Sequence, residues 1–134
     1  MIRISSVTAS ISRAAPLRRS FSRAVSSRVQ VLDADSQYTD LIAKPTKSVV
    51  YFTAAWCGPC KMISPIYAEL SNEFTDIEFA KVDVDELDET AAKAGVRAMP
   101  TFHFYANGKL QQSLGFAGAD PKQLFNNVKK LKEL

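Results

Sequence analysis

Apolar and polar positions along the chain alternate in two different ways, which predicts short strands and short helices in turn. Runs rich in β-branched and aromatic residues predict strands at residues 29–32, 48–53, 77–84 and 101–105. Apolar residues at helical spacing predict helices over residues 33–44, 60–74, 86–94 and from 121 onward. This order predicts an α/β fold, a central mixed β-sheet flanked by helices on both faces.

Turn and cap residues refine the ends of these segments. Asn107-Gly108 is typical of a two-residue hairpin turn, so a fifth strand over residues 109–114 is expected to pair antiparallel with 101–105. Asp120-Pro121 combines an N-cap residue with proline at the first helical position and predicts the start of the last helix. Asp85 is expected to cap the helix over 86–94.

Both cysteines of the chain lie in one segment, Trp56-Cys57-Gly58-Pro59-Cys60-Lys61. A strand pattern precedes this segment and a helical pattern follows it, so Cys57 is expected where a strand passes into a helix. Unpaired N–H groups and the positive end of the helix dipole lower the pKa of a thiol at such a place. Cysteines at i and i+3 are neighbours on a helix and can close a disulfide or open to a dithiol. The pattern therefore predicts thiol–disulfide exchange.

Metal chemistry is a weaker interpretation of the same cysteines. Structural zinc takes four ligands, whereas the chain offers only Cys57, Cys60 and His103, so no metal site is expected. An iron–sulfur cluster bridging two chains is a further alternative, but Gly-Pro is not the usual spacer of proteins that bind one. His103 alternates with two phenylalanines on a strand, which favours a structural or surface position over a catalytic base.

Charge is distributed unevenly between the two ends of the chain. Residues 1–32 contain six arginines and no acid, whereas the remainder has eleven lysines and arginines against fourteen acids. The formal net charge of +3 therefore arises from the N-terminal segment and gives no indication of nucleic-acid binding. No stretch approaches the roughly 18 apolar residues of a membrane span.

The basic, serine-rich and acid-free start of the chain is typical of a mitochondrial or plastid transit peptide. We expect residues 1–28 to be a cleaved mitochondrial leader and residues 29–134 to form one domain. Arg19-Ser20-Phe21-Ser22 resembles a mitochondrial processing site, with cleavage after Phe21. A disordered basic tail without targeting function is the alternative.

Four segments together resemble the thioredoxin family over about residues 29–134. They are Trp-Cys-Gly-Pro-Cys-Lys at 56–61, Val-Arg-Ala-Met-Pro-Thr at 96–101, Gly108, and Phe-Ala-Gly-Ala at 116–119. The resemblance implies the thioredoxin fold, a Cys57–Cys60 disulfide in the oxidised state and a protein-disulfide reductase activity. With the basic leader, the chain most resembles mitochondrial members, and Tyr-Phe-Thr-Ala-Ala-Trp before the cysteines is similar to the plant o-type.

The resemblance also implies a role for each matching residue. Cys57 would be the exposed nucleophile that attacks a client disulfide, and Cys60 the more buried residue that resolves the mixed disulfide. Pro100 is expected to be cis, so that the Met99 backbone can pair with a client segment like an added strand. The implied substrate-binding residues are Trp56, Gly58, Pro59, Met99, Pro100, Thr101, Gly118 and Ala119.

Three features depart from the family pattern. Tyr51 occupies the position of a usual buried aspartate, and Lys81 resembles the usual partner of that acid, so both are expected to tune the site. Lys81 is expected to reach water or to pair elsewhere, for example with Asp83, because a buried lysine without an acid is costly. Thr53 stands where tryptophan is common. The interval from Gly108 to Gly118 is long, which implies a longer hairpin or a bulge.

Partners follow from the resemblance as well. It implies recharging by an NADPH-dependent flavoprotein thioredoxin reductase and clients with disulfides, such as a peroxiredoxin. It implies no bound cofactor, a monomer and, with the leader, the mitochondrial matrix, with the plastid as the alternative. A different class of function is a redox-gated protein-interaction module with little turnover, which a turnover assay would distinguish.

Overall fold

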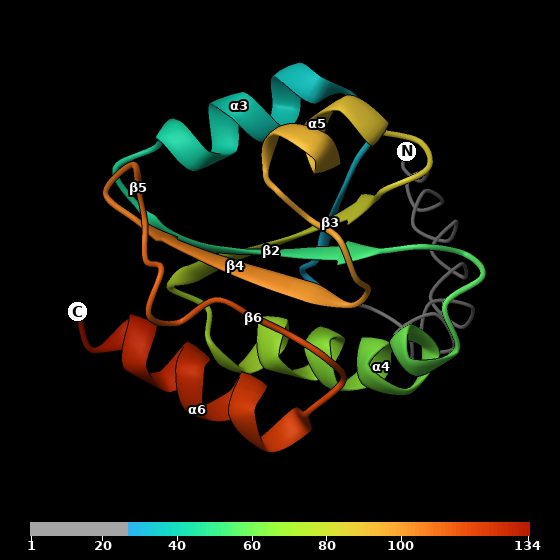
Figure 1. Ribbon diagram of the computed structural model, residues 1–134. Coiled ribbons are helices and arrows are strands. Elements are labelled where there is room, and N and C mark those ends of the chain that lie inside the picture. Colours follow the sequence, from blue (N-terminus) through green and yellow to red (C-terminus); the bar gives the residue numbers. More distant parts are fainter. Residues whose placement is uncertain (1–26) are drawn as a thin grey trace, which may run out of the picture.

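The computed structural model describes residues 27–134, which form a sheet between two layers of helices (Figure 1). Helices α3 (Asp35–Ala43) and α5 (Asp88–Lys93) cover one face of the sheet. Helices α4 (Gly58–Glu73) and α6 (Pro121–Lys132) cover the other face. The predicted α/β architecture with helices on both faces is therefore confirmed.

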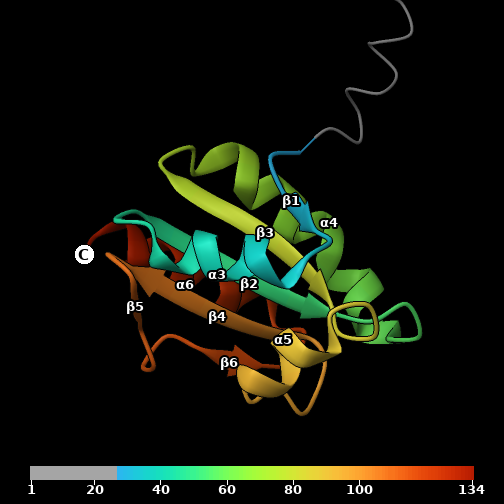
Figure 2. The ribbon, with the colours of Figure 1, turned by 90° about the horizontal axis from the view of Figure 1, so that it is seen from above.

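The sheet is mixed, and its central strand is β2. Strands β1 (Gln30–Leu32), β3 (Ile77–Asp83) and β2 (Lys47–Thr53) run parallel in that spatial order, and β4 (Thr101–Ala106) pairs antiparallel with β2. Figure 2 shows these strands side by side from above. Because β2 has a neighbour on each side and helices on both faces, its run of apolar residues is almost continuous.

Side chains of β2 alternate between two hydrophobic cores, as the pleat of a strand requires. Val49 and Tyr51 belong to the core that also contains side chains of α4 and α6. Val50 and Phe52 belong to the smaller core on the side of α3 and α5. The larger core holds most of the buried aromatic rings: Tyr51, Tyr67, Phe74, Phe79, Phe102 and Phe104.

The hairpin after β4 differs from the predicted single strand over 109–114. Its turn is as expected, with φ of 55° at Asn107 and 79° at Gly108. The returning chain is divided into β5 (Lys109–Leu110) and β6 (Phe116–Ala117), and its register on β4 shifts by three residues between them. A turn at residues 112–114 holds these extra residues, so the expected longer hairpin is confirmed and the continuous strand is wrong.

The predicted capping role of Asp85 is wrong, whereas Asp120 caps α6 as expected. Helix α5 begins at Asp88, later than predicted. The turn before it is organised by Asp83, whose Oδ1 accepts the backbone N–H groups of Asp85 at 2.8 Å and Glu86 at 3.3 Å. The Asp85 side chain is thereby left available for another contact.

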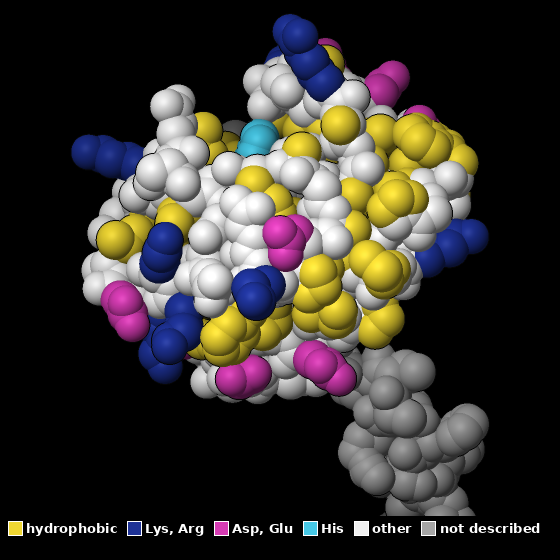
Figure 3. Space-filling view, turned by 60° about the horizontal axis from the view of Figure 1, so that its bottom comes forward, with side chains coloured by type: hydrophobic (Ala, Val, Ile, Leu, Met, Phe, Trp, Pro, Cys, Tyr) yellow, Lys and Arg dark blue, Asp and Glu magenta, His cyan; other side chains and the backbone are white. Residues whose placement is uncertain are grey.

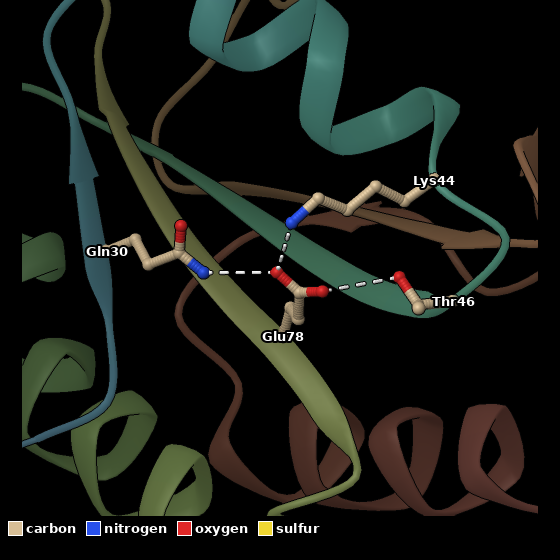
Figure 4. Close-up of polar contacts among 4 residues, drawn as sticks. All are labelled: Gln30, Lys44, Thr46 and Glu78. Atoms are coloured by element: carbon tan, nitrogen blue, oxygen red, sulfur yellow. Dashed lines mark hydrogen bonds and ion pairs between the residues drawn. The ribbon is translucent and has the colours of Figure 1, made fainter.

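Glu78 joins three segments at one end of the sheet (Figure 4). Its Oε1 accepts hydrogen bonds from Gln30 Nε2 and Lys44 Nζ, both at 3.2 Å, and its Oε2 accepts one from Thr46 Oγ1 at 3.4 Å. Burial alone would raise the pKa of Glu78. The hydrogen bonds and the charge of Lys44 together lower it by more, so the pKa lies below the ordinary 4.5.

The start of the described chain is attached to α4. The backbone N–H of Arg28 donates to Ser71 Oγ at 3.0 Å, and Arg28 Nη1 donates to the carbonyls of Ser71 at 2.7 Å and Phe74 at 3.4 Å. The predicted leader up to residue 26, including the processing site at Phe21, lies outside the described residues. Within residues 27–134, no helix has the length and apolar character to cross a membrane.

Candidate active site

Cys57 lies at the N-cap of α4, just after the end of β2, as the sequence predicted. Its Sγ accepts a hydrogen bond from the backbone N–H of Cys60 at 3.2 Å. Pro59 lies in the first helical turn, where its missing N–H leaves no helical bond unmade. A thiolate formed at Cys57 on reduction would therefore have a backbone donor and the positive end of the helix dipole beside it, both of which stabilise the charged form.

Cys57 and Cys60 form a disulfide in this structure. Cys57 is 3% exposed and Cys60 is 2% exposed. The expected contrast between an exposed and a buried cysteine is therefore absent in this disulfide form. The physical reason is that both side chains belong to the core between the sheet and the helices α4 and α6.

Apolar side chains are exposed close to the disulfide in the sequence. Trp56 is 66% exposed and Met62 is 56% exposed, and Gly58 and Pro59 lie at the surface. The indole Nε1 of Trp56 donates to Asp85 Oδ2 at 2.9 Å. Figure 3 shows the side of the molecule formed by α4 and α6, where hydrophobic side chains gather over one half of the surface. Exposed apolar area of this kind is typical of a docking surface for proteins.

The loop before β4 contributes further predicted residues. The Met99–Pro100 bond is cis, as expected. Met99 is half-buried and packs against the core cluster that contains both cysteines. Its backbone N–H and C=O make no hydrogen bond to another residue of the described chain. These two groups are therefore available to a bound segment.

Gly118 and Ala119 lie beside this loop, as the resemblance to the thioredoxin family implied. The backbone N–H of Gly118 donates to the carbonyl of Pro100 at 2.8 Å. Ala119 packs against the same core cluster as Met99. Thr101 is buried at the start of β4, and its hydroxyl donates to the carbonyl of Ala98 at 2.6 Å. The structure thus brings together the two segments that the sequence predicted to bind substrate.

Tyr51 is fully buried beneath the first turn of α4. Its hydroxyl donates to the carbonyl of Cys60 at 3.0 Å and lies 2.8 Å from Ser64 Oγ. Sequence reasoning did not identify Ser64. Its position four residues after Cys60 and directly before Pro65 was the available signal, because serine in a helix can bond back to the carbonyl at i−4.

A cavity of about 330 Å³ lies against Cys60. Charged side chains of Lys61, Lys81, Asp83 and Glu86 line it, together with Thr53 and Ser64. Lys81 is half-buried and has no ion-pair partner among residues 27–134. The expectation that Lys81 reaches water is consistent with its place on this open cavity, and the suggested pair with Asp83 does not form.

His103, the remaining possible metal ligand, lies away from this cavity. Its ring packs edge-on against Phe52, with 5.1 Å between ring centroids, and burial lowers the pKa of the imidazole. No group of three or more His, Cys, Asp or Glu residues in the described part of the chain is arranged to hold a metal ion.

The fold and the site together define a thiol–disulfide oxidoreductase with a two-cysteine centre at the start of a helix. A family model described as Thioredoxin matches residues 28–130. The chain belongs to the thioredoxin family. It reduces disulfides in partner proteins through the dithiol–disulfide cycle of Cys57 and Cys60.

Individual relatives agree with this assignment. Thioredoxin-1 of Schizosaccharomyces pombe is 44% identical over 100 residues, which are 75% of this chain and 94% of that protein. Thioredoxin O1, mitochondrial, of Arabidopsis thaliana is 44% identical over 86 residues, 63% of this chain and 43% of that protein. The crystal structure of Malassezia sympodialis thioredoxin superposes with a TM-score of 0.73 at 37% identity, covering 78% of this chain and 91% of that one.

Proposed function

We propose that this protein is a reducing thioredoxin of the mitochondrial matrix, in which Cys57 attacks and Cys60 resolves. The observation that carries the order of the two cysteines is the hydrogen bond from the Cys60 N–H to Cys57 Sγ. That donor favours the thiolate at Cys57, and the thiolate is the attacking species in disulfide exchange. Cys60 lies further into the helix and is in position to attack Cys57 Sγ once a client is attached.

Client proteins would be recognised through backbone and apolar contacts. The free N–H and C=O of Met99 can pair with an extended client segment, as a strand pairs with a sheet edge. Trp56 would cover part of the client, and Gly58, Pro59, Gly118 and Ala119 would allow it to approach the disulfide closely. This mode of recognition is largely independent of sequence, which suits a general reductase.

The partners that complete the cycle follow from the family. A flavoprotein thioredoxin reductase would return two electrons from NADPH to the Cys57–Cys60 disulfide. A peroxiredoxin is a suitable client. One similar structure, with a TM-score of 0.71 and 36% identity, comes from work on thiol resolution in yeast mitochondrial 1-Cys peroxiredoxin by the glutathione and thioredoxin systems.

Two observations support the mitochondrial location. The first 32 residues carry six arginines and no acid, which is the composition of a transit peptide. Mitochondrial relatives include Arabidopsis Thioredoxin O1 and Mitochondrial Thioredoxin 3 of Saccharomyces cerevisiae, whose structure superposes with a TM-score of 0.70 at 37% identity. Import of the full chain into isolated mitochondria, with plastids in parallel, tests the location. N-terminal sequencing of imported protein should give Ser22, and exclusive import by plastids would overturn the proposal.

Turnover of insulin disulfides, with NADPH and a thioredoxin reductase as electron source, tests the activity. Protein starting at Ser22 should support rapid NADPH oxidation, and Cys57→Ser should abolish it. Cys60→Ser should instead accumulate mixed disulfides. A negative result has two causes: cysteines that do not exchange, or a reductase that is not the right partner. A repeat with dithiothreitol separates them, because it bypasses the reductase. Turnover with dithiothreitol alone would contradict only the reductase partner.

A further inference from the structure

Two side-chain hydroxyls converge on the backbone carbonyl of the resolving cysteine. Tyr51 Oη lies 3.0 Å and Ser64 Oγ 2.8 Å from the Cys60 carbonyl oxygen, and the two hydroxyl oxygens lie 2.8 Å apart. A carbonyl oxygen has two lone pairs and can accept both protons. Both hydroxyls are within donor distance of the carbonyl, and their two protons suffice for these two hydrogen bonds.

The helical hydrogen bonds of α4 are interrupted beside Cys60. Pro65 has no N–H, so the carbonyl of Lys61, one residue after Cys60, loses its helical donor. The residue before a proline is also disfavoured in the α conformation, and that residue is Ser64. The helical ladder therefore lacks one bond directly after Cys60, and the two hydroxyls add contacts at the carbonyl that precedes this gap.

Tyr51 is itself held rigidly. Its side chain is completely buried and stacks on Phe102, with 5.0 Å between ring centroids and an interplanar angle of 11°. The ring of Tyr67 contacts it edge-on at 4.9 Å. Because Tyr51 is on the central strand, its hydroxyl connects the backbone of Cys60 directly to the most buried part of the sheet.

We propose that Tyr51, assisted by Ser64, is a positioning residue for the resolving step. By holding the Cys60 carbonyl, it keeps Cys60 Sγ directed at Cys57 Sγ while a client is bound to Cys57. In that step the Cys60 thiol loses its proton to solvent in the adjacent cavity, and its thiolate forms a bond to Cys57 Sγ. The bond from Cys57 to the client breaks, and the client sulfur leaves with the electron pair and takes up a proton. The dithiol is oxidised by two electrons and the client disulfide is reduced. This inference rests on the proposed roles of the two cysteines.

The two chemical steps can be observed separately with an aromatic disulfide. Reduced protein mixed with one equivalent of 5,5′-dithiobis(2-nitrobenzoic acid) should release one coloured thiolate when Cys57 attacks and a second when Cys60 resolves. Tyr51→Phe keeps the buried ring and removes the hydroxyl. Loss of one buried hydrogen bond predicts a second release about three- to tenfold slower, with the first release unchanged. Ser64→Ala should act in the same direction, and Ser64→Thr should restore the rate.

Tyr67→Phe is the matched control. The Tyr67 hydroxyl is equally buried and donates to the carbonyls of Val49 and Ala80, at 3.0 and 2.7 Å, but does not contact Cys60. Its loss should lower stability without slowing the second release. If Tyr51→Phe resolves at the normal rate, or if Tyr67→Phe is slowed equally, the proposal is wrong. A single release by the unaltered chain would instead remove the role of Cys60 and the proposal together. Should Tyr51→Phe not fold, the Ser64 variants decide alone.

Discussion

Trp56, the only tryptophan of the chain, is connected to Asp85 by a hydrogen bond of 2.9 Å from the indole Nε1 to Oδ2. The two residues come from different segments, the loop before α4 and the turn after β3. The bond therefore sets the orientation of an exposed apolar ring that stands next to Cys57. It also gives a role to an acid that the sequence suggested only as a helix cap.

Replacing Asp85 should weaken client binding while leaving the chemistry of the cysteines intact. Asp85→Ala removes the acceptor and frees the indole to rotate, so we expect the KM for a protein client to rise about threefold, which is the effect of one hydrogen bond of ordinary strength. Asp85→Asn keeps an acceptor oxygen and should remain close to normal. Fluorescence anisotropy of the single tryptophan provides an independent measurement. An unchanged anisotropy in Asp85→Ala would show that the bond does not orient the ring.

Gly118 should be intolerant of a side chain for conformational reasons. Its φ is +117°, which L-residues rarely adopt, although a Cβ would meet no atom within 4 Å. Gly118→Ala should therefore cost about 1–2 kcal/mol of stability. Because the Gly118 N–H bonds to Pro100, the KM for a protein client should rise as well. Denaturant titration and insulin-reduction kinetics check both effects.

Gly58→Ala is the matched control for that substitution. A Cβ at Gly58 also meets nothing within 4 Å, but its backbone lies in the first turn of α4 without a positive φ. Its stability should be unchanged or slightly raised, because alanine is the better helix former. Equal losses in the two alanine variants would argue against strain at Gly118.

His103, the single histidine, should make the fold less stable in mild acid. Burial lowers its pKa below the ordinary 6.5, and its buried Nδ1 has no hydrogen-bond partner in the described part of the chain. The unfolded chain therefore binds the proton more readily than the folded one. The stabilisation is complete above pH 6.5 and decreases as the pH falls from there towards the lower pKa of the folded state. NMR titration of this imidazole and pH-dependent melting, with His103→Phe as control, would measure both.

Glu78 should produce a separate loss of stability at lower pH. Its folded pKa lies below 4.5, so its contribution is complete above that value and is lost as the pH falls through the folded pKa. Glu78→Gln cannot ionise and should show a smaller loss over this range. Melting curves between pH 3 and 6 would separate the Glu78 effect from that of His103. If Glu78→Gln has the same pH profile as the unaltered protein, the hydrogen bonds of Glu78 are not a source of acid sensitivity.

The sequence predicted features that depend on local pattern. The change from strand to helix at Cys57 follows from a buried run before it and helical spacing after it, and the hairpin turn follows from Asn107-Gly108. The contacts that complete the site depend on residues that are distant in the chain. Tyr51 reaches Cys60 only because β2 passes beneath α4. The pattern of apolar residues along the chain does not predict such a contact.

Wrong predictions arose where two local solutions were nearly equivalent. Asp83 and Asp85 are both suited to capping the following turn. In the structure Asp83 accepts its N–H groups, and the Asp85 carboxylate instead accepts the hydrogen bond of Trp56. The segment over 109–114 had a strand pattern. The chain between Gly108 and Gly118 is longer than the stretch of β4 it pairs with, so the extra residues leave the sheet between β5 and β6. Tertiary packing decided both cases.

Arg28 should stabilise the domain, although the sequence predicted it to be the last residue of a leader. Its guanidinium donates to two carbonyls at the C-terminal end of α4, where orphan carbonyls and the negative end of the helix dipole favour a cation. Arg28→Ala should therefore lower the free energy of unfolding by about 1–3 kcal/mol. Arg97→Ala, which removes an exposed arginine, should leave stability within about 0.5 kcal/mol.

The same contact gives a test of the proposed processing site. A chain that begins at Ser22 retains Arg28, whereas one that begins at Val29 loses both its side chain and its backbone bond to Ser71. Urea unfolding of the two chains should therefore show the shorter one to be less stable by at least as much as Arg28→Ala. Equal midpoints would mean that the arginine contacts contribute nothing. In that case, processing as late as residue 28 would be as compatible with a stable domain as processing after Phe21.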